Sequence, residues 1–342
     1  MHIAGIGIIF NRGRGLENLD KALQEGWRKP YPVYRVPVEA LTDKNVLKDA
    51  RRADDLTKMA VLAAYDAFTD SGLGLEAKKT LGIIISTAFG PHVTTFRFLD
   101  DILNYGDANV SPTIFSHSVH NAAASYISLL LQSRGPTLTI TQFAKSFQQS
   151  IILAESWIKE GRCDYILVGS VDQCGKVMEY ICSQKLVLAD DGIIRPFLFS
   201  DTPAAVPGEG SVFFLLTNKE VPKKYAAISA FPEARANRPD MYLLDCDGMY
   251  GSEETYLEAC RTKPLVSSYT PIFGSMLTVS SFSCAVAALM LRNQQHYAAP
   301  VQDNPHGLNI CRTKQSAAIK SISCIRYGCN NERIESFLYC RN

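Results

Sequence analysis

The chain has 342 residues, of which 46% are hydrophobic and 20% are charged. This composition is typical of an ordinary globular protein with one large core or two fused cores. The formal net charge of +1 gives no electrostatic reason to expect nucleic acid or an anionic membrane as the main partner.

The ten cysteines contain no Cys-x-x-Cys pair. We therefore predict buried, reduced thiols in a cytoplasmic protein rather than a disulfide framework or a zinc site. The apolar start, residues 1–10, has no basic leader and ends at Asn11, so it predicts a first buried strand rather than a signal sequence. No segment has the length and apolarity that would predict a membrane span.

Strands and helices alternate along the rest of the sequence. Hydrophobic periodicity predicts helices at 16–27, 51–73, 147–158, 253–261 and 282–292. Strands are predicted at 81–87, 137–141, 164–169, 212–217, 225–231 and 241–246, with a closing hairpin at 316–339. This alternation indicates an α/β protein, and the polar connector 218–224 is the natural border between two halves.

The clearest feature is a strand–corner–helix–strand unit that Gly135 and Pro136 open. Its first strand consists of Thr137, Leu138, Thr139, Ile140 and Thr141. At such a corner the unpaired N–H groups and the helix dipole stabilise a thiolate or an oxyanion, so a Cys or Ser is expected at the apex. The residues found there are Gln142, Phe143, Ala144, Lys145 and Ser146.

The runs 135–141 and 161–172 together resemble the β-ketoacyl synthase family of the thiolase fold. The signatures Arg195-Pro196-Phe197 and Gly208-Glu209-Gly210 are also similar to family motifs. The resemblance implies two related α/β halves in a layered α-β-α-β-α arrangement, here divided as 1–217 and 218–342 within one compact unit. Because the stretch from Gly210 to Asp247 is short for this family, we expect a shortened second half.

Carried over residue by residue, the resemblance finds the family's reactive positions changed. The nucleophilic cysteine corresponds to Ala144, the two histidines to Asp247 and Thr278, and a lysine to Phe273. The glycine-rich final turn corresponds to 326–331, where two of three glycines are lost. A carboxylate placed where an enolate develops would repel it. The resemblance therefore implies no catalytic residue, cofactor or metal site, and a chain that is not an enzyme by itself.

The implied function is that of a chain length factor-like subunit. Such a subunit forms a heterodimer with an active β-ketoacyl-[acyl carrier protein] synthase and meets the acyl carrier protein through that complex. The strand 137–141 would lie at the interface, and Ile114, Phe115 and Val119 would line the partner's acyl tunnel. The pathway would be of the polyene, polyketide or fatty-acid type, with the corner most similar to bacterial aryl polyene subunits.

Several alternatives stay open at this point. The three apolar residues 114, 115 and 119 also fit a local core near a helix start. Gln142 fits a malonyl-[acyl carrier protein] decarboxylase in which glutamine replaces the cysteine, and a self-pairing scaffold that binds the carrier protein is a third possibility. The pair His117 and His120 has metal-ligand spacing but no evident third ligand.

Overall fold

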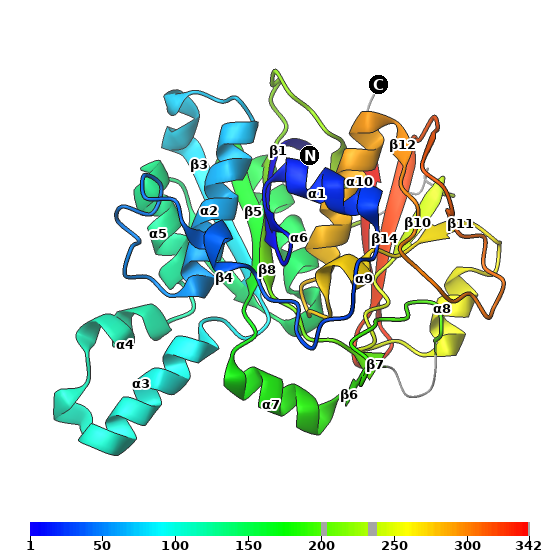
Figure 1. Cartoon of the computed structure of the whole chain (residues 1–342). Coiled ribbons are helices and arrows are strands. Elements are labelled where there is room, and N and C mark those ends of the chain that lie inside the picture. The colour runs from blue at the N-terminus through cyan, green and yellow to red at the C-terminus, as the bar shows by residue number, and fades with distance from the viewer. Residues whose placement is uncertain (200–203, 232–237, 341–342) are drawn as a thin grey trace.

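The fold is built on one long sheet whose two halves have the same topology (Figure 1). It is described from a computed structural model that covers residues 1–199, 204–231 and 238–340. The strand order is β11-β10-β14-β15-β9-β1-β8-β5-β3-β4. The first half contains β1 (His2–Phe10), β3 (Leu81–Thr87), β4 (Thr137–Thr141), β5 (Tyr165–Asp172) and β8 (Gly210–Thr217). The second contains β9 (Ala227–Ser229), β10 (Met241–Leu244), β11 (Leu265–Ser267), β14 (Ser321–Tyr327) and β15 (Arg333–Tyr339).

In each half the strands, numbered in chain order, lie side by side as 3-2-4-5-1. The second strand pairs in parallel with the third and the fourth, and the fifth pairs antiparallel with the fourth and the first. The halves join through the antiparallel pair His2 and Ala227. This repetition is the two-half arrangement that the sequence implies. The boundary between 217 and 218 stays a prediction.

Helices cover the sheet in three layers, which confirms the layered thiolase-like prediction. The outer face of the first half carries α2 (Asp55–Asp70) and α5 (Ala122–Leu131). The middle layer holds α6 (Ser146–Lys159) and α10 (Ser280–Asn293), and α8 (Glu253–Ala259) covers the second half from outside. The strands can be covered on both faces because the side chains of successive residues point to opposite sides of the sheet. Ile83 belongs to the apolar cluster under α2 and α5, and Ile84 belongs to the cluster that contains α6.

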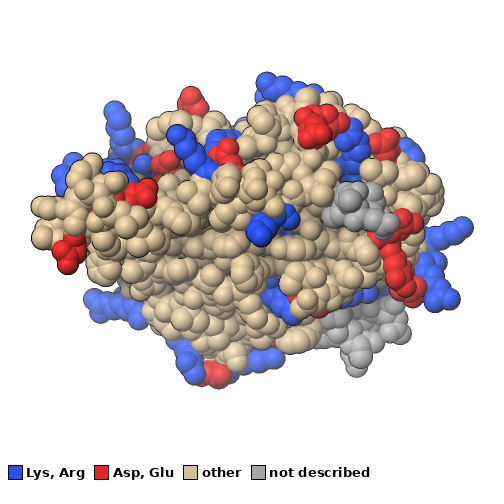
Figure 2. All heavy atoms as spheres, turned by 90° about the horizontal axis from the view of Figure 1, so that it is seen from below, with Lys and Arg blue, Asp and Glu red and all other residues tan. Residues whose placement is uncertain are grey.

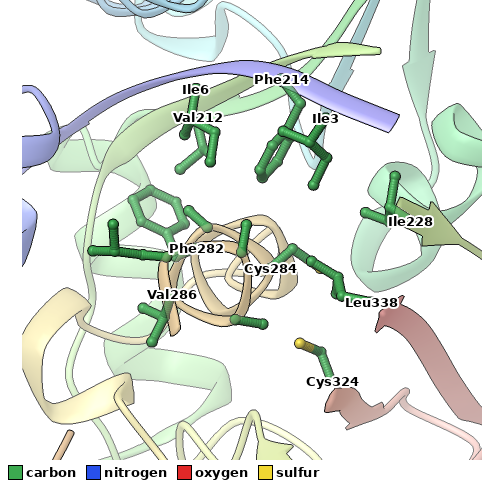
Figure 3. Close-up of a cluster of buried hydrophobic side chains, with 14 of the residues drawn as sticks. Ile3, Ile6, Val212, Phe214, Ile228, Phe282, Cys284, Val286, Cys324 and Leu338 are labelled. Atoms are coloured by element: carbon green, nitrogen blue, oxygen red, sulfur yellow. The ribbon is translucent and has the colours of Figure 1, made fainter. Parts of the chain in front are cut away.

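The central helix α10 is buried along almost its whole length (Figure 3). Strands of both halves surround it with apolar side chains, among them Ile6, Phe214 and Leu338. On the opposite face, α2 approaches β1 so closely that a Cβ at Gly7 would meet the carbonyl oxygen of Ala63 at 1.9 Å. Glycine in the first strand is therefore a packing requirement.

The predicted long helix at 51–73 is shorter in the structure. It begins at Asp55 because the Asp54 side chain accepts a hydrogen bond from the Thr57 N–H at 2.8 Å and caps it. Likewise the first helix, α1 (Leu16–Glu25), ends two residues early at Gly26. The remaining elements are β2 (Gly13–Arg14), α3 (His92–Tyr105), α4 (Pro112–Ser118), α7 (Lys176–Lys185), β6 (Val187–Leu188), β7 (Ala204–Ala205), α9 (Thr270–Phe273), β12 (Gln295–His296) and β13 (Gln315–Ser316).

The pair α3 and α4 stands out from the body of the molecule on the lower left in Figure 1, and α7 lies along the same lower side. None of the helices in the described part of the chain has both the length and the apolar composition that a bilayer crossing demands.

Asp245, directly after β10, is a buried carboxylate that ties this strand to the middle layer. Its Oδ1 accepts a hydrogen bond from the Ser283 hydroxyl of α10. Burial raises the pKa of Asp245 from 3.8 to about 6, although the nearby Arg326 opposes this shift. The folded protein therefore holds this proton more tightly than the unfolded chain does.

We predict that Asp245→Asn removes one part of the pH dependence of stability. Because the folded pKa lies above 3.8, the free energy of unfolding should fall as pH rises through the window from about 4 to 6, by about 3 kcal/mol. Asparagine keeps an acceptor for Ser283 and cannot ionise. Urea unfolding of both proteins should be measured from pH 4 to 7. The free energy of unfolding of the variant should increase relative to that of the wild type as pH rises. Parallel curves would contradict the assignment.

Candidate functional site

The corner between β4 and α6 is the centre of the candidate site. Ala144 is buried there and packs with Ala88, Leu277 and Ile334. These neighbours come from the end of β3, the turn before α10 and the start of β15. The structure therefore brings both halves of the chain together around the position that the sequence comparison singled out. Gln142, in contrast, is exposed.

Asp172, the last residue of β5, connects this corner to the turn before α10. Its Oδ1 accepts hydrogen bonds from the Ala88 N–H at 2.8 Å and the Thr87 hydroxyl at 3.0 Å. Its Oδ2 accepts the Thr278 hydroxyl at 2.8 Å. Burial raises the pKa of Asp172, while the hydrogen bonds from Ala88, Thr278 and Thr87 oppose that shift. Thr278 thus acts as a donor to a buried carboxylate.

Asp247 forms a buried ion pair with Arg326. The Arg326 Nη2 donates to the Asp247 Oδ2 at 3.1 Å, and each side chain is only 1% exposed. The carboxylate also accepts the backbone N–H groups of Met249 and Met276, each at 3.2 Å. Burial raises the pKa of Asp247, and Arg326 opposes that rise. The guanidinium stays charged because its carboxylate neighbours outweigh its own desolvation, so its pKa is raised.

These contacts place two of the predicted positions beside the corner. Asp247 is bonded to Met276, two residues before Thr278, and Met249 packs with Ala144. The fourth position is different. Phe273 is buried in the large core, where its ring meets those of Phe10 at 5.6 Å and Phe282 at 5.1 Å. The structure gives Phe273 a packing role.

Chemically, the site combines two buried carboxylates, a guanidinium and the amino end of α6 around a small apolar cluster. The thiol of Cys174, two residues after β5, has its pKa raised to about 12 by burial, so little thiolate forms near neutral pH. In the described residues no group of three or more His, Cys, Asp or Glu is arranged to hold a metal ion. The His117 Nε2 lies 2.7 Å from the Tyr126 hydroxyl.

The predicted tunnel residues lie on and after α4. Phe115 and Val119 are exposed and Ile114 is half-buried, which argues against a local core of this chain. The Phe115 ring contacts Phe98 of α3 at 5.4 Å. The predicted interface strand 137–141 is β4, which forms one end of the sheet and, among the residues that the structure describes, pairs only with β3.

Sequence reasoning did not find three contributors to this site. Asp172 lies three residues beyond the strand predicted at 164–169, and its role depends on Thr87 and Thr278, which are distant in sequence. Arg326 was expected only to obstruct a glycine turn, whereas it neutralises Asp247. The available signal was a pair of opposite charges, with Asp247 at a histidine position and Arg326 in the former glycine turn. Phe143 has a left-handed backbone, φ +44°, which no local motif indicates.

We predict that Arg326→Met destabilises the protein by about 3–5 kcal/mol, because it leaves Asp247 buried without a counter-charge. The double variant Arg326→Met, Asp247→Asn should recover most of that loss, because asparagine still accepts from the Met276 N–H. Urea unfolding at pH 7 measures both effects. Equal losses in the single and double variants would show that the ion pair is not the cause.

Comparison with known proteins gives the context of this site. The β-ketoacyl synthase N-terminal domain family matches residues 33–221, more than half of the chain. Nodulation protein E of Rhizobium meliloti (strain 1021) is 26% identical over 184 residues, which cover 50% of this chain and 46% of that protein. The 3-oxoacyl-[acyl-carrier-protein] synthase 2 of Coxiella burnetii is 21% identical over 185 residues, which cover 50% of this chain and 45% of that protein. The chain thus matches just under half the length of these relatives.

Solved structures show the same fold over the whole chain. The ishigamide ketosynthase/chain length factor superposes with a TM-score of 0.80 at 16% identity, covering 100% of this chain and 99% of that one. A β-ketoacyl synthase from Burkholderia phymatum STM815 superposes with a TM-score of 0.82 at 15% identity, covering 100% of this chain and 99% of that one. A structure of a type II polyketide synthase acyl-carrier protein in complex with its ketosynthase superposes with a TM-score of 0.80 at 12% identity, covering 99% of each chain.

The prediction that the chain is not an enzyme by itself is contradicted by these relatives, several of which are named as 3-oxoacyl-[acyl-carrier-protein] synthases. It rested on four side-chain positions alone. Around the corner the structure has two buried carboxylates, a guanidinium and the amino end of α6. On the match over residues 33–221, the chain belongs to the β-ketoacyl synthase family.

Proposed function

We propose that this chain is a ketosynthase-type subunit of an acyl-chain-elongating enzyme. In this proposal it pairs through β4 with a second chain of the same family, whose thiol carries the growing acyl group. Its own contribution is to complete the sheet and to shape the acyl tunnel of the pair through Ile114, Phe115 and Val119. The acyl carrier protein is the partner that brings the chain to the complex.

The observation that carries this proposal is the open edge of β4. The Pro136 carbonyl accepts the Ile83 N–H at 2.9 Å. Because successive residues of a strand direct their backbone groups to opposite sides, Thr137, Thr139 and Thr141 present theirs to the free edge. The strand has no proline, charge or bulge to prevent pairing. Such an edge fits the antiparallel addition of another strand.

The surface next to this edge also fits a protein interface. Figure 2 shows the molecule from below, and the middle of this face is almost free of Lys, Arg, Asp and Glu. On α3 the apolar residues Val93, Phe96, Leu99 and Leu103 are exposed at helical spacing. Exposed apolar area of this kind on a soluble family member marks an interaction site. Phe115 and Val119 of the neighbouring α4 segment continue it.

The decarboxylase alternative has no support from the corner's geometry. Gln142 is exposed, whereas the residue that packs with Ala88 and Leu277 is Ala144. Self-pairing of two copies remains an outcome of the association experiment below. The narrower assignment to an aryl polyene pathway and a cytoplasmic location stay predictions.

We predict that Thr139→Pro abolishes pairing with a co-expressed ketosynthase chain while the variant stays folded. Proline removes an N–H that faces the free edge and leaves the hydrogen bonds to β3 in place. Size-exclusion chromatography with light scattering measures the complex. Thr139→Val keeps the N–H and is the matched control. A proline variant that pairs as tightly as the control would refute the β4 interface.

We also predict that side-chain volume at α4 sets product length. Phe115→Ala should lengthen the acyl product of the pair by at least one two-carbon step, and Ile114→Trp should shorten it, since both side chains are available to a partner's tunnel. Mass spectrometry of the carrier-bound chain measures the product. Leu75→Ala, at an exposed position outside α3 and α4, is the control. An unchanged distribution in both variants would remove the tunnel assignment.

A further inference from the structure

Phe143 combines two properties that the folded chain itself does not explain. Its backbone has φ +44°, in the left-handed region where a bulky L-residue is unfavourable. Its side chain is nevertheless 60% exposed. A strained backbone is normally retained where the surroundings or a function require it. Here the strain holds an aromatic ring out in solvent.

The ring lies in an exposed apolar cluster at the end of β4. It meets the Phe89 ring edge-on, with centroids 5.6 Å apart and an interplanar angle of 74°. Phe89 and Val93, which follow β3, are themselves exposed. Phe89 also contacts the ring of His92, at 6.5 Å. The cluster thus supports Phe143 from one side and leaves its other side free.

The position of Phe143 relates it to the free edge of the sheet. It is two residues beyond Thr141, the last residue of β4. In antiparallel pairing, the end of one strand lies opposite the beginning of the other. In this chain the beginning of β4 adjoins a shallow hollow in which Leu129 is the apolar side chain; the other lining residues are Ser125, Ser128, Gln132, Ser133, Arg134 and Thr137. A paired chain of the same fold presents the corresponding surface to Phe143.

We propose that Phe143 is a specificity-determining anchor of the interface with the paired ketosynthase-family chain, into which its ring inserts beside the start of the partner's edge strand. This inference rests on the proposed function. Large aromatic side chains in this kind of setting dominate binding energy at protein interfaces. The left-handed backbone aims the ring outward, and Phe89 limits its motion.

The test separates an anchor from a residue needed for folding. Phe143→Gly relieves the backbone strain, so the isolated chain should be at least as stable as the wild type to urea. The same variant, and Phe143→Ala, should weaken the complex with the co-expressed ketosynthase chain at least 30-fold, about 2 kcal/mol. Leu75→Ala is the control, because Leu75 is 75% exposed and precedes the start of β3, whereas Phe89 follows the end of that strand.

Titration of the purified chains, together with the urea measurement, gives four distinguishable results. Weakened binding with retained stability, and an unaffected Leu75→Ala control, supports the anchor. Unchanged affinity of both Phe143 variants, with wild-type pairing intact, overturns this inference and leaves the proposed function standing. If the wild-type chains do not pair at all, both this inference and the proposed function are overturned. A glycine variant that is less stable alone also overturns the anchor, because the ring would then serve the fold.

Discussion

The ion pair between Asp247 and Arg326 is the constraint on which the geometry around Ala144 depends. Two opposite charges that are each 1% exposed are costly to bury, so the segments that carry them must stay in register. Arg326 lies on β14 and Asp247 follows β10, and the carboxylate also holds the backbone of Met276 before α10. The Asp247 carboxylate thereby links three segments of the second half beside the β4–α6 corner of the first half.

Much of the framework could be predicted because each strong element carries its own periodic signal. The strand Thr137–Thr141 was predicted with its observed bounds, since a Gly-Pro pair and a polar corner delimit it. Helix α3 was missed although its apolar residues recur at helical spacing and Pro91 and Gly106 bound it. The helix at 51–73 was too long because the Asp54 cap outweighs the two preceding arginines.

The site was less predictable because its contacts join distant residues. Resemblance to the family identified Ala144, Asp247 and Thr278 as changed positions, yet the partners of the last two depend on tertiary structure. Asp247 meets Arg326, 79 positions away, and Thr278 meets Asp172, 106 positions away. Local patterns contain no information on such pairs. The prediction that the chain is not an enzyme was made from single positions as well, and it is contradicted by relatives named as synthases.

The duplicated topology offers a comparison inside the molecule itself. Strands β4 and β11 are the third strands of their halves, and both stand at an end of the sheet. The edge of β11 is blocked by its own chain, because Val266 bonds with Asn309 and Cys311. No such segment pairs with β4 among the described residues. An unprotected edge strand risks aggregation, so its retention in one half and its closure in the other favour a dedicated partner for β4.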